Sequence, residues 1–262
     1  MAVDTGRTSA ALLYHHVGPL AETHCRGLNV TTSAFQVQIR ALSALGFESI
    51  LVSDWIAYTE GRAGIPDRPL IITFDDAYAS LTEHALPVLE RYGFTATVYV
   101  PTALVGRTIV CDPAHSDATL AVMTADDIRT WAARGFEFGA HTQTHADLSL
   151  LGEHAAVSEI HGSRQDLEAI LGCPVTSFAY PYGRASAGAE RAVRATFPCA
   201  FSIEEGLNDA ATPAWRLRRT MVQHADSVAD VCLRARFGRS AFADARTAAR
   251  RALRFPRRFP FS

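Results

Sequence analysis

The sequence predicts a single α/β domain of alternating strands and helices, and it favours a (β/α) barrel over an open doubly wound sheet. Apolar runs of strand length alternate with segments of helical period in seven or eight successive units, which is typical of parallel strands with helical crossovers. No glycine-rich fingerprint follows the first predicted strand, which argues against a nucleotide-binding open sheet. The 262 residues, 48% hydrophobic and 20% charged, are enough to form one large core.

The strands are predicted from short runs of apolar or β-prone residues. One of them, PLIITF at residues 69–74, leads directly into the adjacent carboxylates Asp75 and Asp76. The predicted strands are residues 11–16, 48–52, 69–74, 95–100, 136–141, 175–183, 199–203 and 215–222.

The helices are predicted where helical periodicity lies between start and stop signals. Residues 31–46 open on threonine and serine and end at Gly46. In residues 124–135, Thr124 is the N-cap, Asp127 is the third helical residue, and Gly135 is the C-terminal cap. The other predicted helices are residues 54–61, 78–93, 152–172, 186–196 and 226–238, and residues 101–123 are predicted to form a long loop.

Composition excludes several function classes. The formal net charge is −2, so the chain lacks the basic field of most nucleic-acid-binding proteins. All 25 basic residues are arginine, which excludes Schiff-base chemistry and a Walker-type phosphate loop, since both require lysine. The five cysteines are scattered and form no C-x-x-C pair, which argues against a disulfide framework or a zinc ribbon.

The two ends of the chain suggest where in the cell the protein acts. The N-terminal residues do not resemble a signal peptide, and no apolar run is long enough to span a bilayer, so we expect a cytoplasmic protein. The last 30 residues contain nine arginines and one aspartate. We therefore divide the chain into a barrel at 1–235 and a basic helix or tail at 236–262. This tail is a candidate for peripheral contact with an anionic membrane or glycan, and an exposed helix with a frayed end is the alternative.

Polar residues recur at the C-terminal ends of the predicted strands. They are His15, Asp75 with Asp76, His141, residues 180–183 and an arginine of the RLRR segment. In a barrel of parallel strands these ends meet on one face, where such folds place their active sites.

Two of these clusters indicate a metal site. His141 and His145 are four residues apart, a spacing that on a helical turn places both imidazoles on one side. Asp75 and Asp76 would repel each other unless one is neutralised, and a cation held by Asp76 would leave Asp75 as an ionised base. The alternatives are two ordinary loop histidines, and an aspartate pair in which one residue caps the next helix while the other faces solvent.

Three motifs together resemble the polysaccharide deacetylases that share the NodB homology domain, carbohydrate esterase family 4. TFDDAY resembles their first motif, HTQTHADLSLL their second and FAYPYG their third, and the resemblance covers roughly residues 10–225. It implies a distorted (β/α) barrel of about seven strands.

The resemblance also implies a set of roles. Asp76, His141 and His145 would bind a divalent metal, most simply Zn²⁺, with Co²⁺, Ni²⁺ or Fe²⁺ as alternatives. Asp75 would be the general base that takes a proton from the metal-bound water, and the backbone N–H of Tyr182 would help to hold the oxyanion.

The sequence departs from the family pattern at the general acid. Many members place an acid histidine in an L-x-H motif near the C-terminus, and here only His224 follows the third motif. LLYHHV instead resembles the circularly permuted poly-β-1,6-N-acetylglucosamine deacetylases, in which a histidine after tyrosine on the first strand is the acid. That residue is His15, and His16 should point to the other side of the strand.

A second departure concerns the arginine that orients the base. The family arginine, two residues before the proline of the third motif, is replaced by Ala179. Arg219 is our candidate to supply the missing contact. Arg216 and Arg218 are alternatives, and all three could instead be exposed on an edge strand.

We therefore expect a metal-dependent hydrolase that removes N-acetyl groups, in preference to O-acetyl groups, from an N-acetylhexosamine-containing carbohydrate. Hydrolysis of another non-peptide C–N bond, such as a formamide or cyclic amide, and an inactive sugar-binding protein are the alternatives. The candidate substrate contacts are the aromatic residues, which can stack on sugar rings or belong to the core, and the proline of the third motif. They are Tyr78, Pro181, Tyr182 and Trp215.

Overall fold

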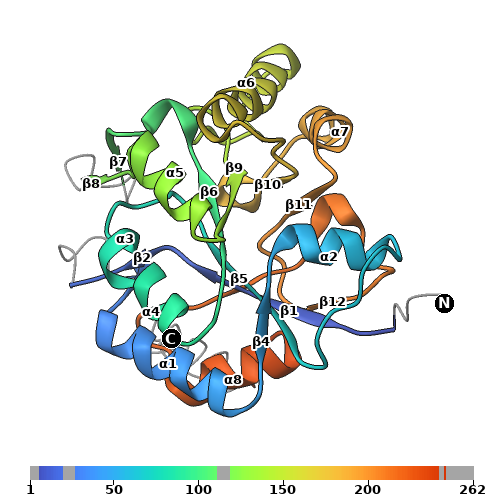
Figure 1. The fold of residues 1–262 in the computed structure, drawn as a ribbon. Coiled ribbons are helices and arrows are strands. Elements are labelled where there is room, and N and C mark those ends of the chain that lie inside the picture. The colour runs from blue at the N-terminus through green and yellow to red at the C-terminus, as the bar shows by residue number, and fades with distance from the viewer. Residues whose placement is uncertain (1–5, 20–26, 111–118, 242–244, 246–262) are drawn as a thin grey trace, which may run out of the picture.

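A curled sheet forms the centre of the computed structural model, which describes residues 6–19, 27–110, 119–241 and 245 (Figure 1). Its nine strands are β1 (Ser9–Tyr14), β4 (Glu48–Ile50), β5 (Pro69–Phe74), β6 (Thr97–Val100), β9 (Glu137–Ala140), β10 (Ser177–Ala179), β11 (Cys199–Phe201), β12 (Leu207–Asn208) and β13 (Thr220–Met221). The order is β11-β10-β9-β6-β5-β1-β12, with β4 also on β5 and β13 also on β1. All these pairs are parallel except β1 with β12.

The segment around Leu217 connects the two ends of this sheet. Leu217 bridges to Phe201 of β11, and its backbone exchanges hydrogen bonds of 2.8 Å with Ala200 and Ser202. Three residues further on, β13 pairs with β1 at Leu12. The strands therefore curl into a distorted barrel within one domain, which confirms the predicted fold class.

Helices cover the outside of the barrel (Figure 1). They are α1 (Thr32–Ala44), α2 (Val52–Thr59), α3 (Leu81–His84), α4 (Leu86–Arg91), α5 (Ala125–Ala133), α6 (Glu153–Leu171), α7 (Ala187–Thr196) and α8 (Val228–Phe237). Every residue of β1 and β5 is buried, as expected for strands that are covered on both faces. The predicted capping box of α5 is confirmed, because Thr124 accepts from the Asp127 N–H and Asp127 accepts from the Thr124 N–H.

The predicted single helix at residues 78–93 is wrong. It is divided at Ala85 into α3 and α4, and it begins only at Leu81. Pro87 explains the division, because it has no N–H to donate and its ring clashes with the carbonyl four residues earlier.

The predicted loop at residues 101–123 contains regular structure. It includes the 3₁₀ turn η2 (Thr102–Leu104) and the antiparallel pair β7 (Thr108–Val110) and β8 (Thr119–Ala121). A second small sheet pairs β2 (His16–Val17) with β3 (Asn29–Val30). Two further 3₁₀ turns are η3 (Pro181–Gly183) and η4 (Ala214–Arg216), and the latter replaces the start of the predicted strand at 215–222.

The structure describes only part of the predicted basic segment at the C-terminus. Helix α8 continues past the predicted boundary at residue 235 and ends at Phe237, before a left-handed Gly238. Most of the predicted basic segment at 236–262 lies outside the described residues. Within the described part of the chain, no helix is both long and apolar enough to cross a membrane.

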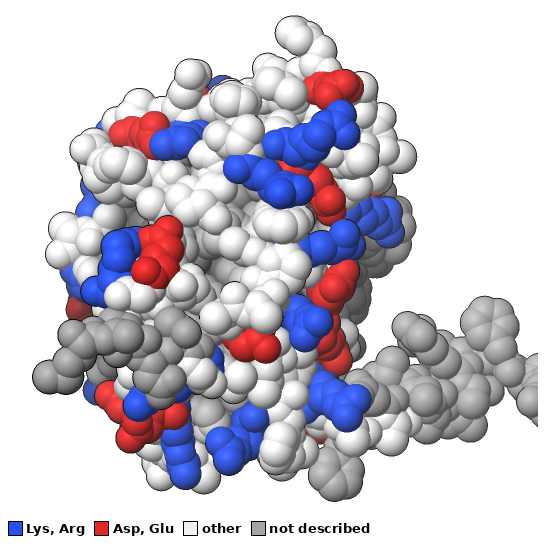
Figure 2. All heavy atoms as spheres, turned by 90° about the vertical axis from the view of Figure 1, so that its right-hand side faces the viewer, with Lys and Arg blue, Asp and Glu red and all other residues white. Residues whose placement is uncertain are grey.

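On the face shown in Figure 2, basic and acidic side chains lie next to one another around a mostly uncharged centre.

Replacement of Gly139 by alanine should destabilise the barrel. A Cβ atom on Gly139 would lie 2.3 Å from the Tyr99 ring and 2.7 Å from the Ser177 hydroxyl, so the buried neighbours would have to move. Overpacking of this kind costs about 1–3 kcal/mol. Urea denaturation should show this loss for Gly139→Ala and a change within about 0.5 kcal/mol for the control Gly64→Ala, whose Cβ meets nothing within 4 Å. Equal stability of the two variants would contradict the packing described here.

Candidate metal centre

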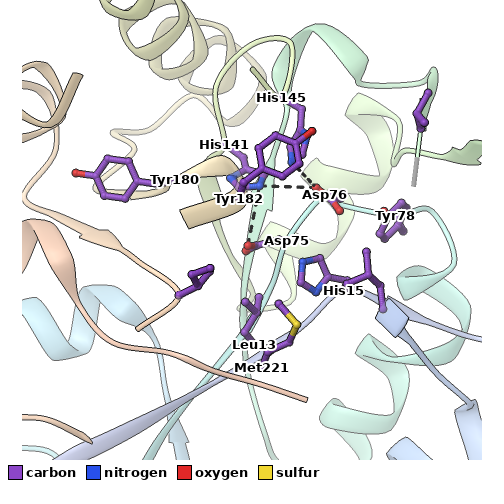
Figure 3. Close-up of a pocket in the computed structure, with 13 residues that line it drawn as sticks. Leu13, His15, Asp75, Asp76, Tyr78, His141, His145, Tyr180, Tyr182 and Met221 are labelled. Carbon is purple, nitrogen blue, oxygen red and sulfur yellow. Dashed lines mark ion pairs between the residues drawn. The ribbon is translucent and has the colours of Figure 1, made fainter. Parts of the chain in front are cut away.

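The polar strand ends meet at one pocket (Figure 3). Asp75 and Asp76 directly follow β5, His141 directly follows β9, and His15 directly follows β1. All four line the pocket together with His145. This is the C-terminal face of the parallel strands, as the sequence predicts.

Three of these residues form a compact set of ligand atoms. The Nε2 atom of His145 lies 3.1 Å from Asp76 Oδ1, and the Nε2 atom of His141 lies 3.7 Å from the same oxygen. One ligand atom from each residue falls within 4.8 Å of the others. In Figure 3 the three side chains point toward one another.

The donor set fits a divalent transition metal. Two imidazoles and one carboxylate are a common protein ligand set for zinc, which leaves a position open for water or substrate. Asp76 Oδ1 is fully buried and receives no hydrogen bond of good geometry from the described residues. A buried carboxylate oxygen in this condition is costly, and a cation between the three side chains would satisfy it.

The protonation states of His141 and Asp76 suit metal binding, whereas His145 would have to lose a proton to bind a cation. The Nδ1 atom of His141 donates to the Ala179 carbonyl at 2.7 Å, so Nε2 faces the other ligands. Burial lowers the pKa of His141 to about 4, and the imidazole is therefore neutral at pH 7. Burial would lower the pKa of His145 as well, but the neighbouring Asp76 carboxylate outweighs it and raises that pKa. Burial opposes ionisation of Asp76, yet the histidines keep its pKa well below the usual range.

The connection from His141 to His145 differs from the prediction. The segment is irregular rather than a helical turn, with Thr142 at φ 62° and His145 at φ 61°. In the described residues, positive φ at non-glycine positions occurs only here, at Asp76 and Ala77, and at Tyr182. Each such residue costs about 1–3 kcal/mol unless its surroundings hold it, and such strain is concentrated at functional sites.

Asp75 has a different partner from Asp76. Its two carboxylate oxygens accept from Arg219 Nη1 at 2.6 Å and Nη2 at 2.9 Å. The Arg219 side chain is 0% exposed and also donates to the Ser202 carbonyl. Burial would raise the pKa of Asp75, but the Arg219 guanidinium lowers it below the ordinary value, so Asp75 is ionised. Of the three candidate arginines, Arg219 contacts Asp75, whereas Arg216 pairs with Glu190 and Glu204.

His15 and His16 occupy different environments. His15 lines the pocket, and its Nδ1 atom is buried with no hydrogen-bond partner among the described residues. Burial lowers the pKa of His15. His16 instead contacts Asn29 Oδ1 through Nδ1 at 2.6 Å and packs its ring on Tyr78. The alternative acid, His224, is exposed and is not among the residues that line the pocket.

The candidate substrate contacts divide into two groups. Tyr78 and Tyr182 line the pocket, and Tyr182 is 43% exposed with its ring edge-to-face on His145. Pro181 is buried beside the pocket at the start of η3. The structure does not bring Trp215 to this pocket, because its ring stacks on the Arg194 guanidinium 3.7 Å away and lines a separate cavity.

Sequence reasoning missed the apolar part of the pocket. In Figure 3, Leu13 and Met221 lie below Asp75. Both come from strands that pair directly with each other, since Leu13 of β1 is opposite Met221 of β13. In the sequence these residues look like ordinary core positions, and only the pairing of the first and last strands places them in the pocket.

Comparisons with known proteins identify the family of the chain. The family model described as polysaccharide deacetylase matches residues 63–197, just over half of the 262 residues. YxkH of Bacillus subtilis (strain 168) is 24% identical over 173 residues, which cover 66% of this chain and 56% of YxkH. The poly-β-1,6-N-acetyl-D-glucosamine N-deacetylase of Staphylococcus aureus is 24% identical over 167 residues, which cover 60% of this chain and 55% of that protein. The matches thus span little more than half the length of these relatives.

A solved structure shares this fold over most of the chain. The Streptococcus pyogenes deacetylase PplD, in complex with acetate, matches with a TM-score of 0.76 at 22% identity over 88% of this chain and 99% of that chain. The family match covers the strands that carry Asp75, Asp76, His141 and His145. On the extent of the family match, the chain belongs to the polysaccharide deacetylase family.

Proposed function

We propose that the protein is a metal-dependent hydrolase that removes N-acetyl groups from an N-acetylhexosamine-containing carbohydrate. One observation carries the proposal. The ligand set of Asp76, His141 and His145 lies beside Asp75, which is ionised and held by Arg219. All four residues line a pocket that His15 also lines. The Staphylococcus aureus relative, named for de-N-acetylation of a glucosamine polymer, supports the choice of substrate class.

Each residue near the ligand set has a distinct role in this proposal. A bound divalent cation would lower the pKa of a coordinated water and polarise the acetyl carbonyl. Asp75 is the general base that removes the proton of the attacking water, and Arg219 keeps it ionised and fixes both of its oxygens. The backbone N–H of Tyr182, in the turn that follows β10, helps to stabilise the negative charge on the acetyl oxygen.

His15 supplies the proton to the leaving amine. An amine leaving group must be protonated as the C–N bond breaks, and His15 is the pocket histidine outside the ligand set. The carboxylates of Asp76 and Asp75 favour the protonated form of His15, but burial outweighs them and keeps its pKa below the ordinary value. Zn²⁺ is the expected cation, although this ligand set also accepts Co²⁺, Ni²⁺ or Fe²⁺.

Removal of metal should abolish acetate release. The purified protein is treated with a chelator, dialysed, and assayed for acetate on a panel of N-acetylhexosamine oligomers before and after Zn²⁺ is restored. We expect release to fall to background after chelation and to recover with Zn²⁺, because the ligand set then lacks or regains its cation. Absence of chelator-sensitive release from every oligomer would move the assignment to another C–N bond or to an inactive binding protein.

Asp75→Asn should lose turnover but keep metal binding. The amide cannot accept the proton of the attacking water, and loss of a general base costs about 10²- to 10⁴-fold in rate. Zinc content, measured by elemental analysis, should match the wild type because Asp76, His141 and His145 are unchanged. Retention of full activity by Asp75→Asn would show that Asp75 is not the base.

His15→Ala should impair amides more than activated esters. The change removes the proton donor for an amine, so kcat on an N-acetyl substrate should fall by about 10²- to 10⁴-fold. Hydrolysis of 4-nitrophenyl acetate should fall far less, because its leaving group departs as a stable anion. His224→Ala is the matched control and should leave both activities unchanged. An equal loss on both substrates would contradict the acid role of His15.

A further inference from the structure

The segment between the two histidine ligands has an unusual backbone that something must hold. Thr142 and His145 both have positive φ, and the two residues between them, Gln143 and Thr144, are not part of a helix or strand. The position of His145 therefore depends on contacts made by this segment, because no regular hydrogen-bond pattern fixes it. We call residues 141–145 the ligand loop.

Glu159 of α6 binds the middle of the ligand loop. Its Oε2 atom accepts from the backbone N–H of Gln143 at 2.8 Å and from that of Thr144 at 2.9 Å. Its Oε1 atom accepts from the Thr144 hydroxyl at 2.8 Å. One carboxylate thus satisfies three donors of the loop, and hydrogen bonds to a charged acceptor are stronger than neutral ones.

Asp166 extends this contact two turns further along α6. Its Oδ2 atom accepts from the Gln143 side-chain amide at 2.8 Å and from the Thr102 hydroxyl at 2.8 Å. Gly162 lies between the two carboxylates on the same helix face, and a Cβ atom there would lie 2.4 Å from Gln143 Cδ. The missing side chain at Gly162 makes room for Gln143 to cross the helix.

The turn η2 holds the other side of the ligand loop. The Thr102 N–H donates to the Thr142 carbonyl at 3.1 Å, and the Ala103 N–H donates to the Gln143 carbonyl at 2.9 Å. The loop is therefore enclosed between η2 and α6. In the described ranges of the chain, neither Glu159 nor Asp166 forms an ion pair with a basic side chain, so the contacts found for both carboxylates are with the ligand loop and η2.

We propose that Glu159 and Asp166 are positioning residues that hold the ligand loop in the conformation that binds the cation, an inference that rests on the proposed function. Neither carboxylate is one of the three ligands. They act through hydrogen bonds to Gln143 and Thr144, which place the His145 imidazole against Asp76. Loss of outer contacts of this kind costs about 10- to 100-fold in metal affinity.

The test measures Zn²⁺ affinity rather than activity. Wild type, Glu159→Ala, Glu159→Gln and Asp166→Ala are prepared metal-free, and Zn²⁺ affinity is measured by competition with a chromophoric chelator. We expect Glu159→Ala to bind Zn²⁺ about 10- to 100-fold more weakly. We expect Glu159→Gln to stay close to wild type, because its amide oxygen can accept both backbone N–H groups and its amide N–H can donate to the Thr144 hydroxyl.

A matched control separates this role from general helix stability. Glu153→Gln removes a carboxylate of the same helix whose partner is the exposed Arg191, and it should leave Zn²⁺ affinity unchanged. Gly162→Ala, which favours helix formation but displaces Gln143, should weaken Zn²⁺ binding without lowering the melting temperature. The visible absorption spectrum of the Co²⁺-loaded protein should change in Glu159→Ala and not in Glu153→Gln.

The outcomes distinguish this inference from the proposed function. If the wild type takes up no transition metal, the proposed function fails. If the wild type binds Zn²⁺ but Glu159→Ala and Asp166→Ala bind it with unchanged affinity, the proposed function stands and the positioning role is wrong. Equal losses in Glu159→Ala and Glu159→Gln would also overturn the positioning role, because they would show that charge rather than hydrogen bonding is responsible.

Discussion

The buried contact between Arg219 and Asp75 is the interaction on which the candidate site depends. Asp75 and Asp76 are adjacent, 4% and 5% exposed, and both held in the ionised form, so each needs its own source of positive charge. Arg219 supplies positive charge to Asp75. The histidine pair, together with the cation that we propose to bind there, would supply it to Asp76. Because Arg219 precedes the strand that pairs with β1, this arrangement exists only when the barrel is closed. Loss of one partner of such a buried pair costs about 3–5 kcal/mol.

The closed barrel also holds the residues of the site that have an unfavourable backbone conformation. In the part of the chain that the structure describes, the non-glycine residues with positive φ follow β5, β9 and β10, three strands that are fixed in parallel register by their neighbours. Rigid strands can hold an unfavourable conformation at their ends because the strained residues cannot relax without displacing the strand. The unfavourable backbone conformation of these residues therefore places the Asp76 and His145 side chains so that they point at one another.

The sequence predicted the elements that are decided locally. PLIITF at 69–74 coincides with β5, and residues 152–172 correspond to α6, because apolar pattern and glycine termination act over a few neighbouring residues. For the ligand loop at 141–145 the sequence predicts a helical turn, and the structure has an irregular backbone instead. This conformation depends on contacts with α6, which follows the loop in the chain. The polar strand ends could be predicted to meet, and Arg219 was the candidate partner of Asp75. Local sequence pattern alone left Arg216 and Arg218 as alternatives, because the two partners are 144 positions apart in the sequence.

The position of Arg219 explains how the chain accommodates Ala179, where the family pattern has arginine. Ala179 is fully buried in the same side-chain cluster as Tyr99 and Phe201, inside the barrel. The Arg219 guanidinium lies over those two rings, 5.6 and 5.4 Å from their centroids. A second long cation at position 179 would compete for this space and add an unpaired buried charge. The small residue on β10 therefore leaves space for the arginine at the barrel closure, which provides the guanidinium that binds Asp75.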